Sequence, residues 1–222
     1  MQRSGPTTQD KYLIFFDLET GGINSARHPI IQVAAIAVNS SLEPVEAFEA
    51  KVRFKDSQAT KQSLRKNHYS RGLWAKEALP PEVVATRFSE FLSRYPSHVA
   101  TSSSGVNYSV AQLVAHNAAF DGPFLQAWYA RHDKFLPARF QVLCTLQRAQ
   151  WYFSEHSNLK PPSNFKLATL CEHFRVPFHA ASAHEALGDV TATFMLYKAI
   201  HATERTLNSK DAIATFGAGR LA

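Results

Sequence analysis

Cysteine is scarce in this chain. The 222 residues include two cysteines, Cys144 and Cys171, which lie far apart and have no CxxC partner. A disulfide framework needs several paired cysteines and a zinc knuckle needs closely spaced ones, so the sequence argues against both. We interpret the two thiols as small hydrophobic side chains of a core. This composition fits a reducing compartment, and we expect a cytoplasmic protein.

Long apolar runs are equally scarce. The first run, residues 12–16, stops at Asp17 and is too short for the core of a signal peptide. Nothing after it approaches the roughly 18 apolar residues of a membrane-spanning helix. We therefore expect no membrane association. The chain is long enough to bury one sizeable core, so one domain is the default interpretation.

Acidic residues are fewer than basic ones. The 18 Asp and Glu residues against 24 Lys and Arg residues give a formal net charge of +6. A positive balance suits a polyanionic partner such as nucleic acid, although many basic proteins bind no polyanion. Charge by itself favours this class of partner only modestly.

What the sequence does contain is a series of short apolar strands followed by strands and helices in alternation. Continuous or alternating apolar patterns predict strands at 12–16, 30–38, 45–54, 110–115 and 140–145. Helical spacing of apolar residues predicts helices at 82–95, 120–131 and 185–201. The Ser/Thr-rich stretch 100–109 and the proline-broken stretch 153–163 are typical of loops.

This order of elements predicts an α/β fold, in which helices cover both faces of a mixed sheet. We assign residues 11–204 to the domain and residues 1–10 to an N-terminal extension. Residues 205–222 form a weakly patterned C-terminal tail, a pattern typical of disorder.

Two carboxylates stand where the first strand ends. Side chains alternate along a strand, so Asp17 and Glu19 emerge on one face and Leu18 on the other. Two such charges about 4 Å apart repel by about 4 kcal/mol at an effective dielectric constant near 20. Either a proton or a hard cation such as Mg²⁺ relieves that repulsion. Taken alone, Asp-x-Glu is a weak signal, and a solvated strand end is its more usual interpretation.

A second polar group follows the strand expected at 110–115. Here His116 and Asn117 precede Phe120 and Asp121. Asn117 can cap a helix, which would place Asp121 in the first turns with its carboxylate near the end of the sheet. Asp121 could instead complement the helix dipole, and His116 could be a hydrogen-bonded core residue.

A third group opens the last helix. Five residues of helix turn through about 500°, so His184 and Asp189 can converge only if His184 lies on the loop before the helix. A histidine on a loop beside a metal cluster is well placed to accept a proton from water. The alternative makes His184 a surface residue and Asp189 an ordinary helix acid.

Taken in order, the three groups resemble the DEDDh exonuclease family. The matching residues are Asp17-x-Glu19, His116-Asn117-x-x-Phe120-Asp121 and His184-x-x-x-x-Asp189. That family includes proofreading subunits of replicative polymerases and RNase T-like enzymes. The resemblance covers about residues 11–202, although only these motifs are distinctive. It implies an RNase H-like fold with a mixed five-stranded sheet, in which the three motifs meet at one end.

The resemblance also implies roles for these residues. Asp17, Glu19, Asp121 and Asp189 would hold two Mg²⁺ or Mn²⁺ ions, with Asp17 as the bridging ligand, and His184 would be the general base. Two metals of this kind clamp the attacking and leaving oxygens of an in-line displacement. The expected activity is a 3′–5′ exonuclease that releases 5′-mononucleotides.

Contacts to the substrate are also implied. Backbone groups of residues 18–21, which include Leu18, Thr20 and Gly21, would approach the terminal nucleotide, and Asn117 lies in the same motif as Phe120. Phe120 could stack on a base, or it could belong to the core. The family commonly has a second threonine where this chain has Gly21, which puts contacts to the last sugar or base in doubt.

The segment between 51 and 76 is basic and matches no motif of the family. It carries eight Lys and Arg residues against Asp56 alone, with Tyr69 and Trp74 among them. We expect Lys61, Arg65 and Lys66 to track phosphates of the substrate. A plain solvated loop and helix remains the alternative.

The expected partner is therefore the 3′ end of DNA or RNA, with DNA slightly favoured. The motifs indicate no particular polymerase, repair protein or oligomeric state. Two other functions stay open on this sequence. An RNase H-like endonuclease also uses clustered acids, but generally without the His184–Asp189 pairing. A catalytically silent nucleic-acid-binding or polymerase accessory module would not need all five residues.

Overall fold

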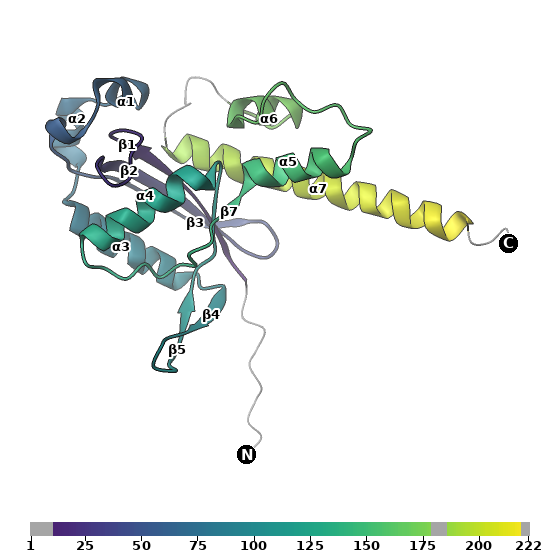
Figure 1. The fold of residues 1–222 in the computed structure, drawn as a ribbon, viewed down its shortest axis with the longest axis horizontal. Helices are drawn as coiled ribbons and strands as arrows, with labels where there is room; N and C mark the ends of the chain where they lie inside the picture. The colour runs from purple at the N-terminus through teal and green to yellow at the C-terminus, as the bar shows by residue number, and fades with distance from the viewer. Residues whose placement is uncertain (1–10, 179–185, 219–222) are drawn as a thin grey trace, which may run out of the picture.

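A five-stranded sheet forms the centre of the molecule in the computed structural model, which describes residues 11–178 and 186–218, with side chains up to residue 206 (Figure 1). The strand order is β3-β2-β1-β6-β7. The strands are β1 (Leu13–Thr20), β2 (Ile30–Val38), β3 (Pro44–Lys51), β6 (Leu113–Ala115) and β7 (Leu143–Cys144). The first three pair antiparallel, and β6 and β7 run parallel to β1. The predicted mixed sheet is confirmed.

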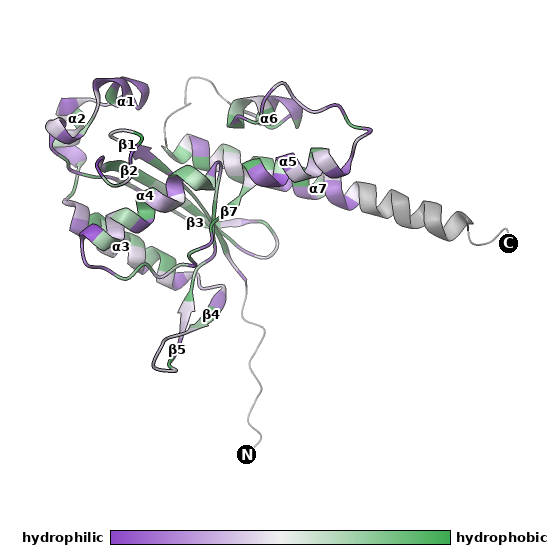
Figure 2. Ribbon diagram, viewed as in Figure 1, coloured by the Kyte–Doolittle hydropathy of each residue, from purple (hydrophilic) through white to green (hydrophobic). Residues whose placement is uncertain are grey.

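The alternation of side chains along β1 sends apolar residues to both faces of the sheet. Ile14, Phe16 and Leu18 belong to one core cluster, whereas Phe15 belongs to another. Figure 2 shows the inner strands as hydrophobic and α1 (Lys61–Lys66) as mainly hydrophilic. A strand buried on both faces accounts for the continuous apolar run in the sequence.

Helices cover both faces. Helices α3 (Pro81–Arg94) and α4 (Ala118–Arg131) contribute Phe88, Phe91 and Trp128 to the core of one face. Helix α7 (Ala186–Ala218) packs Val190 and Phe194 on the other face. A third core joins α7 with α5 (Thr145–Glu155) and α6 (Leu167–His173).

Residues 52–80 leave the sheet after β3 and return to it before α3, and we call this segment the excursion. It contains a 3₁₀ turn (Asp56–Gln58), α1 and α2 (Arg71–Glu77). Its two ends meet, because Val52 forms a β-bridge with Leu79 and the Arg53 N–H donates to the Leu79 carbonyl over 2.8 Å. The indole N–H of Trp74 donates to the Ile31 carbonyl over 3.2 Å, which fastens the excursion to β2.

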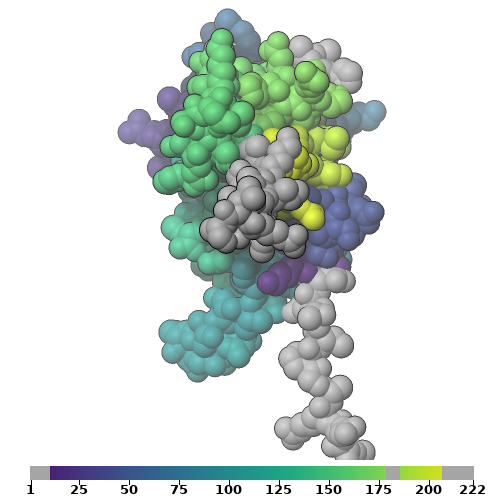
Figure 3. All heavy atoms as spheres, turned by 90° about the vertical axis from the view of Figure 1, so that its right-hand side faces the viewer, coloured from purple at the N-terminus to yellow at the C-terminus, as the bar shows by residue number. Residues whose placement is uncertain are grey.

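One predicted loop is wrong. Residues 100–109 were expected to form a loop, but β4 (His98–Thr101) and β5 (Asn107–Val110) make an antiparallel hairpin there. Figure 3 shows this hairpin, coloured teal, projecting from the body of the molecule. Its strands are mostly exposed, so they carry no apolar alternation for the sequence to reveal. Consequently Val110 belongs to β5, and β6 begins only at Leu113.

Other boundaries also differ from the prediction. Strand β3 ends at Lys51, before the expected residue 54, and β7 is limited to Leu143–Cys144. Helix α5 continues to Glu155, into the stretch expected to be a loop. Helix α7 continues to Ala218, where the pattern predicted an end at 201. No glycine or proline interrupts the chain between 189 and 216, so nothing local stops that helix.

Within the part of the chain that the structure describes, no helix is both long and apolar enough to cross a bilayer.

Candidate active site

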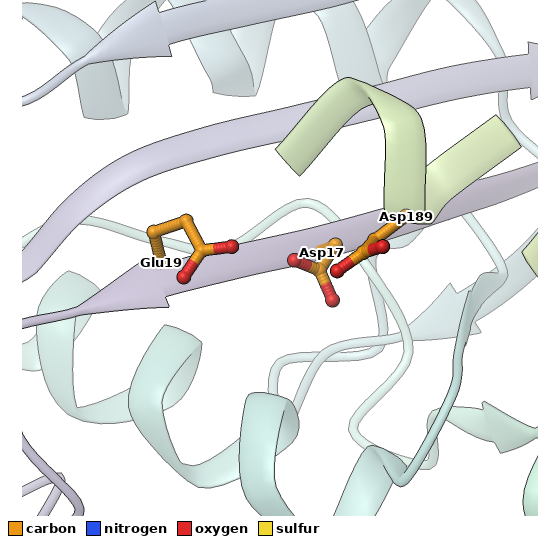
Figure 4. A group of neighbouring side chains, drawn as sticks. All are labelled: Asp17, Glu19 and Asp189. Atoms are coloured by element: carbon orange, nitrogen blue, oxygen red, sulfur yellow. The ribbon is translucent and has the colours of Figure 1, made fainter. Parts of the chain in front are cut away.

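Asp17 and Glu19 lie at the end of β1 and point to the same side of the sheet. Their backbone pairs with Ala34 and Gln32 of β2. This pairing fixes the strand, and the period of two then fixes where the carboxylates point. Figure 4 shows the two side chains next to each other on β1, with the Glu19 carboxylate turned toward Asp17.

Asp189 joins them from the first turn of α7. Oxygen atoms of Asp17, Glu19 and Asp189 all lie within 4.8 Å of one another (Figure 4). The three carboxylates come from positions up to 172 residues apart in the sequence. Because hard divalent cations prefer carboxylate oxygens, this donor set fits such an ion.

Asp121 completes the acidic group from α4. It stands in the first turn of that helix and is 3% exposed. Burial, followed by the charge of Asp17, raises the pKa of Asp121 well above its usual range, and a hydrogen bond from the Leu18 backbone opposes this. Asp121 lies outside the 4.8 Å group of three but lines the same cavity.

The carboxylates destabilise one another's charged forms. Burial, and next the neighbouring Asp189, raises the pKa of Asp17 to about 7. Burial, and then Asp17 and Asp189, raises the pKa of Glu19 to about 9. Lys66 lowers both pKa values and so partly offsets the repulsion. Four acids crowded in this way call for positive charge beyond one lysine.

A cavity of about 230 Å³ contains the four acids. Lys66 of α1, Asn117 and Phe120 also line it. It adjoins a larger hollow of about 870 Å³, with which it shares Lys66, His116, Asn117, Leu167 and Asp189. The acids therefore lie at one end of a continuous groove large enough for more than one nucleotide.

The turn after β1 is fastened to α1 by two hydrogen bonds. The Thr60 N–H donates to the Gly21 carbonyl over 2.7 Å, and the Asn67 side chain donates to the Thr20 carbonyl over 3.0 Å. These bonds stand at the two ends of α1, so the helix that carries Lys66 is held against the acidic cavity.

With this geometry known, the chain can be compared with known proteins. The family model described as an exonuclease matches residues 14–197, most of the chain. The chain belongs to the exonuclease family. The resemblance to DEDDh 3′–5′ exonucleases that the motifs predicted is thereby confirmed.

Two curated proteins have sequences similar to that of this chain. Ribonuclease T of Actinobacillus pleuropneumoniae is 26% identical over 196 residues, which cover 84% of this chain and 82% of the relative. The PolC-type DNA polymerase III of Halalkalibacterium halodurans is 28% identical over 202 residues, which cover 89% of this chain but 12% of the relative. The match to the polymerase is thus confined to a small part of it.

Solved structures of E. coli Exonuclease I share the fold. The complex with a dT13 oligonucleotide superposes with a TM-score of 0.72 at 16% identity, covering 90% of this chain and 43% of the other. A zinc-bound complex with single-stranded DNA gives a TM-score of 0.70 at 17% identity, covering 91% and 43%. The chain spans less than half the length of these proteins. The predicted RNase H-like fold is confirmed.

Of the predicted substrate-contacting residues at the end of β1, some line the acidic cavity and one does not. Leu18 and Thr20 line the acidic cavity, but the Thr20 hydroxyl donates to the Gly22 carbonyl over 2.7 Å. Gly21 is not among the lining residues that the structure describes, and its N–H donates to the Pro29 carbonyl over 2.8 Å. A Cβ at Gly21 would meet Ala59 and Pro29 at 2.9 Å. The missing threonine is therefore explained by these two neighbours.

The residues around the second motif also need one correction. Asn117 stands at the N-cap of α4 as expected, but in the left-handed conformation (φ 66°) and without the capping bond from its side chain. Asn117 instead faces the cavity. Phe120 is half-buried, packs on Phe124 with ring centroids 4.9 Å apart, and lines the cavity as well.

The remaining predicted residues are His184, the three basic residues of α1 and His116. His184 falls outside the described residues. Lys61 and Arg65 are exposed on α1, and Lys66 is the member of that trio that lines the acidic cavity. His116 hydrogen-bonds Thr145 at 2.9 Å and the Phe165 carbonyl at 3.1 Å. Burial lowers the pKa of His116 to about 4, so it stays neutral at physiological pH.

Sequence reasoning missed several residues of the cavity, namely Ile23, Ser63, Asn67 and Leu167. Ser63 and Asn67 belong to the basic segment, which has no family motif. Asn67 bonds a carbonyl 47 positions away. For Ser63 and Asn67, the one signal in the sequence was their position among the basic residues of that segment.

The raised pKa values predict how the stability of the metal-free protein depends on pH. Asp17 and Glu19 both have folded-state pKa values above the unfolded value near 4. The folded state therefore binds more protons than the unfolded state, and the free energy of unfolding falls as pH rises. The loss begins above pH 4 and is complete above about pH 9 for Glu19. The buried His116 acts in the opposite sense only below its ordinary pKa near 6.5. Between about pH 7 and 9 we expect a loss of about 2–3 kcal/mol.

Urea unfolding in EDTA across this range measures the loss. Glu19→Gln should flatten the pH dependence, and so should saturating Mg²⁺ on the unaltered chain. A metal-free protein with equal stability at both ends of the range would contradict the repulsion described here.

Proposed function

We propose that this chain is a metal-dependent 3′–5′ exonuclease, which hydrolyses phosphodiester bonds at nucleic-acid 3′ ends and releases 5′-mononucleotides. The observation that carries the proposal is the convergence of Asp17, Glu19 and Asp189 within 4.8 Å, with Asp121 lining the same cavity. Membership of the exonuclease family supports it. The structural neighbours crystallised with a dT13 oligonucleotide and with single-stranded DNA are consistent with a nucleic-acid substrate.

The four acids fit a pair of divalent cations, and Mg²⁺ or Mn²⁺ suits a site made of oxygen atoms alone. Asp17, Glu19, Asp121 and Asp189 would hold the ions. When bound, such a pair would stabilise the charge on the attacking and leaving oxygens. The chain itself contributes the rigid placement of the acids, because β1 and two helix termini fix them before substrate arrives. Lys66 adds a positive charge beside them.

The proton of the attacking water needs an acceptor, and we assign that role to His184. The DEDDh motif places it five residues before Asp189, whose carboxylate lies among the acids. His116 is not suited to the role, since both its ring nitrogens are hydrogen-bonded within the protein. Phe120 lines the cavity with part of its ring in the core, so we assign it a stacking contact to a terminal base.

Helix α1 supplies a positively charged wall for the same groove. Replacing Lys61, Arg65 and Lys66 together by Gln should weaken oligonucleotide binding and reduce its salt dependence. On single strands, the slope of log K against log salt should become shallower by about 0.7 for each phosphate that the variant no longer neutralises. Anisotropy titrations at several salt concentrations in EDTA measure both quantities. Exchanging Arg87, Lys134 and Lys160 for Gln removes equal charge elsewhere and should leave the slope nearly unchanged.

We take DNA as slightly preferred over RNA. A relative named as a ribonuclease and a relative named as a DNA polymerase are both similar to this chain, so both substrates belong in one test. A time course on matched 5′-labelled DNA and RNA oligonucleotides should show stepwise shortening from the 3′ end in Mg²⁺ or Mn²⁺. EDTA should stop it. Internal cuts at the first time point would instead indicate an endonuclease, and no cleavage with either metal would indicate a silent binding module.

A further inference from the structure

A second hollow, of about 310 Å³, lies on the other side of the loop that joins β1 to β2. Gly22 and Ile23 at the start of this loop line the acidic cavity. Arg27 and His28 near its end line the second hollow, so one short loop separates the two. None of the residues lining the second hollow is a proposed catalytic or metal-binding residue.

The lining of this hollow is positive. Arg27, Arg53 and Arg131 contribute to it together with His28 and His132. Among the described residues, no Asp or Glu lines the hollow and no acidic side chain forms an ion pair with any of these three arginines. The described residues thus give these three guanidinium groups no carboxylate partner, and an anion in the hollow would supply the missing counter-charge.

Two of the arginines are held in place with donors to spare. The Arg131 Nη1 donates to the Ser25 carbonyl over 2.6 Å, and the Arg53 Nη2 donates to the Ala78 carbonyl over 3.1 Å. A guanidinium carries five N–H donors, so most remain available in each case. Guanidinium donors in this number match the oxygens of a phosphate group.

Two further side chains that line the hollow carry an N–H donor. His28 Nδ1 accepts a hydrogen bond from the Asn24 N–H over 3.0 Å, so a neutral ring carries its proton on Nε2. Trp128 lines the hollow, is 2% exposed, and its indole N–H finds no acceptor among the described residues. A buried donor without a partner costs about 1–3 kcal/mol.

We propose that this hollow binds a phosphate group, supplied by the backbone of the nucleic acid outside the bond that is cut. That the phosphate belongs to a nucleic-acid backbone rests on the function proposed above. That the hollow binds phosphate does not. The groove with the acids binds the terminal nucleotides, and the same strand or its complement reaches the arginines past the loop. The hollow thus extends the binding surface of the enzyme without taking part in the chemistry.

Arg27 offers the cleanest variant, since its side chain is exposed and makes no hydrogen bond or ion pair with the described residues. Arg27→Gln/Arg53→Gln should reduce affinity for an oligonucleotide of about 16 nucleotides by about tenfold, because the variant cannot form these charge-assisted hydrogen bonds. Affinity for a dinucleotide, and its hydrolysis in Mg²⁺, should be unchanged. Arg87→Gln is the control, as Arg87 is an exposed arginine that lines a different hollow with Glu49 and Glu77.

Binding is measured by anisotropy in EDTA, so the result does not depend on whether the chain hydrolyses anything. A parallel series compares melting temperatures in phosphate and in chloride at equal ionic strength. If phosphate stabilises the unaltered chain but not the variant, and oligonucleotide affinity is the same in both, the hollow binds free phosphate instead. If the double variant behaves like the Arg87→Gln control in both series, the proposal is overturned.

Discussion

Asp17→Ala should abolish cleavage and leave the fold intact. Asp17 stands between the other acids of the cavity, with oxygen atoms of Glu19 and Asp189 within 4.8 Å, so its loss removes the ligand best placed to serve both proposed ions. We expect the rate to fall by about 10³-fold or more, since the charge stabilisation supplied by a metal pair is lost with it. The measurement is the initial rate of mononucleotide release in saturating Mg²⁺.

The same change should not destabilise the metal-free protein. The charge of Asp17 raises the pKa of both Glu19 and Asp121, so its removal relieves repulsion in the folded state. At pH 8 in EDTA the melting temperature should be equal to or above that of the unaltered chain. Glu90→Ala removes an exposed acid of α3 and should change neither activity nor melting temperature. Full activity in the Asp17 variant would exclude this residue from the mechanism.

His184→Ala should slow turnover by about 10²–10⁴-fold, the usual contribution of a general base. Metal binding should persist, because the four acids remain. The rate of the unaltered enzyme should rise with pH as a group with a pKa near 6.5 loses its proton, and that rise should vanish in the variant. A pH–rate profile at saturating Mg²⁺ measures both effects.

His179→Ala provides a matched control from the same stretch of sequence and should retain the rise. Metal titration followed by thermal stabilisation checks that the His184 variant still binds Mg²⁺. A variant with a lower rate but an unchanged pH profile would assign the proton to another acceptor, and the proposed role of His184 would be wrong.

The sheet was largely predictable from the sequence because its inner strands are buried on both faces. Residues 30–38 are apolar except for Gln32, and every residue of β2 is buried. The β4–β5 hairpin was not predictable in the same way. Its strands are exposed at nearly every position, and its stability comes from cross-strand pairing, such as Val99 with Ser109, that leaves no apolar pattern.

The candidate site likewise contains some residues that were predictable from the sequence and others that were not. The acids were predictable because each follows or opens an element whose pattern is strong, and the ends of those elements meet at one edge of the sheet. Asn67 was not predictable, since its bond to the Thr20 carbonyl exists only after α1 has packed against the end of β1. The hollow lined by arginines likewise gathers positions 27 and 53 from two loops and position 131 from the end of α4. No spacing pattern in a single sequence predicts that such positions lie close together.

The excursion between β3 and α3 leaves and rejoins the domain at adjacent points, where Val52 pairs with Leu79. A chain segment with neighbouring ends can be exchanged for a homologous one without altering the path of the strands on either side. Such a graft would need to retain two anchors, the Trp74 indole on Ile31 and the Asn67 amide on Thr20. Chimaeras built on these boundaries would exchange the basic surface of α1 between nucleases and keep the four acids, none of which lies in the excursion.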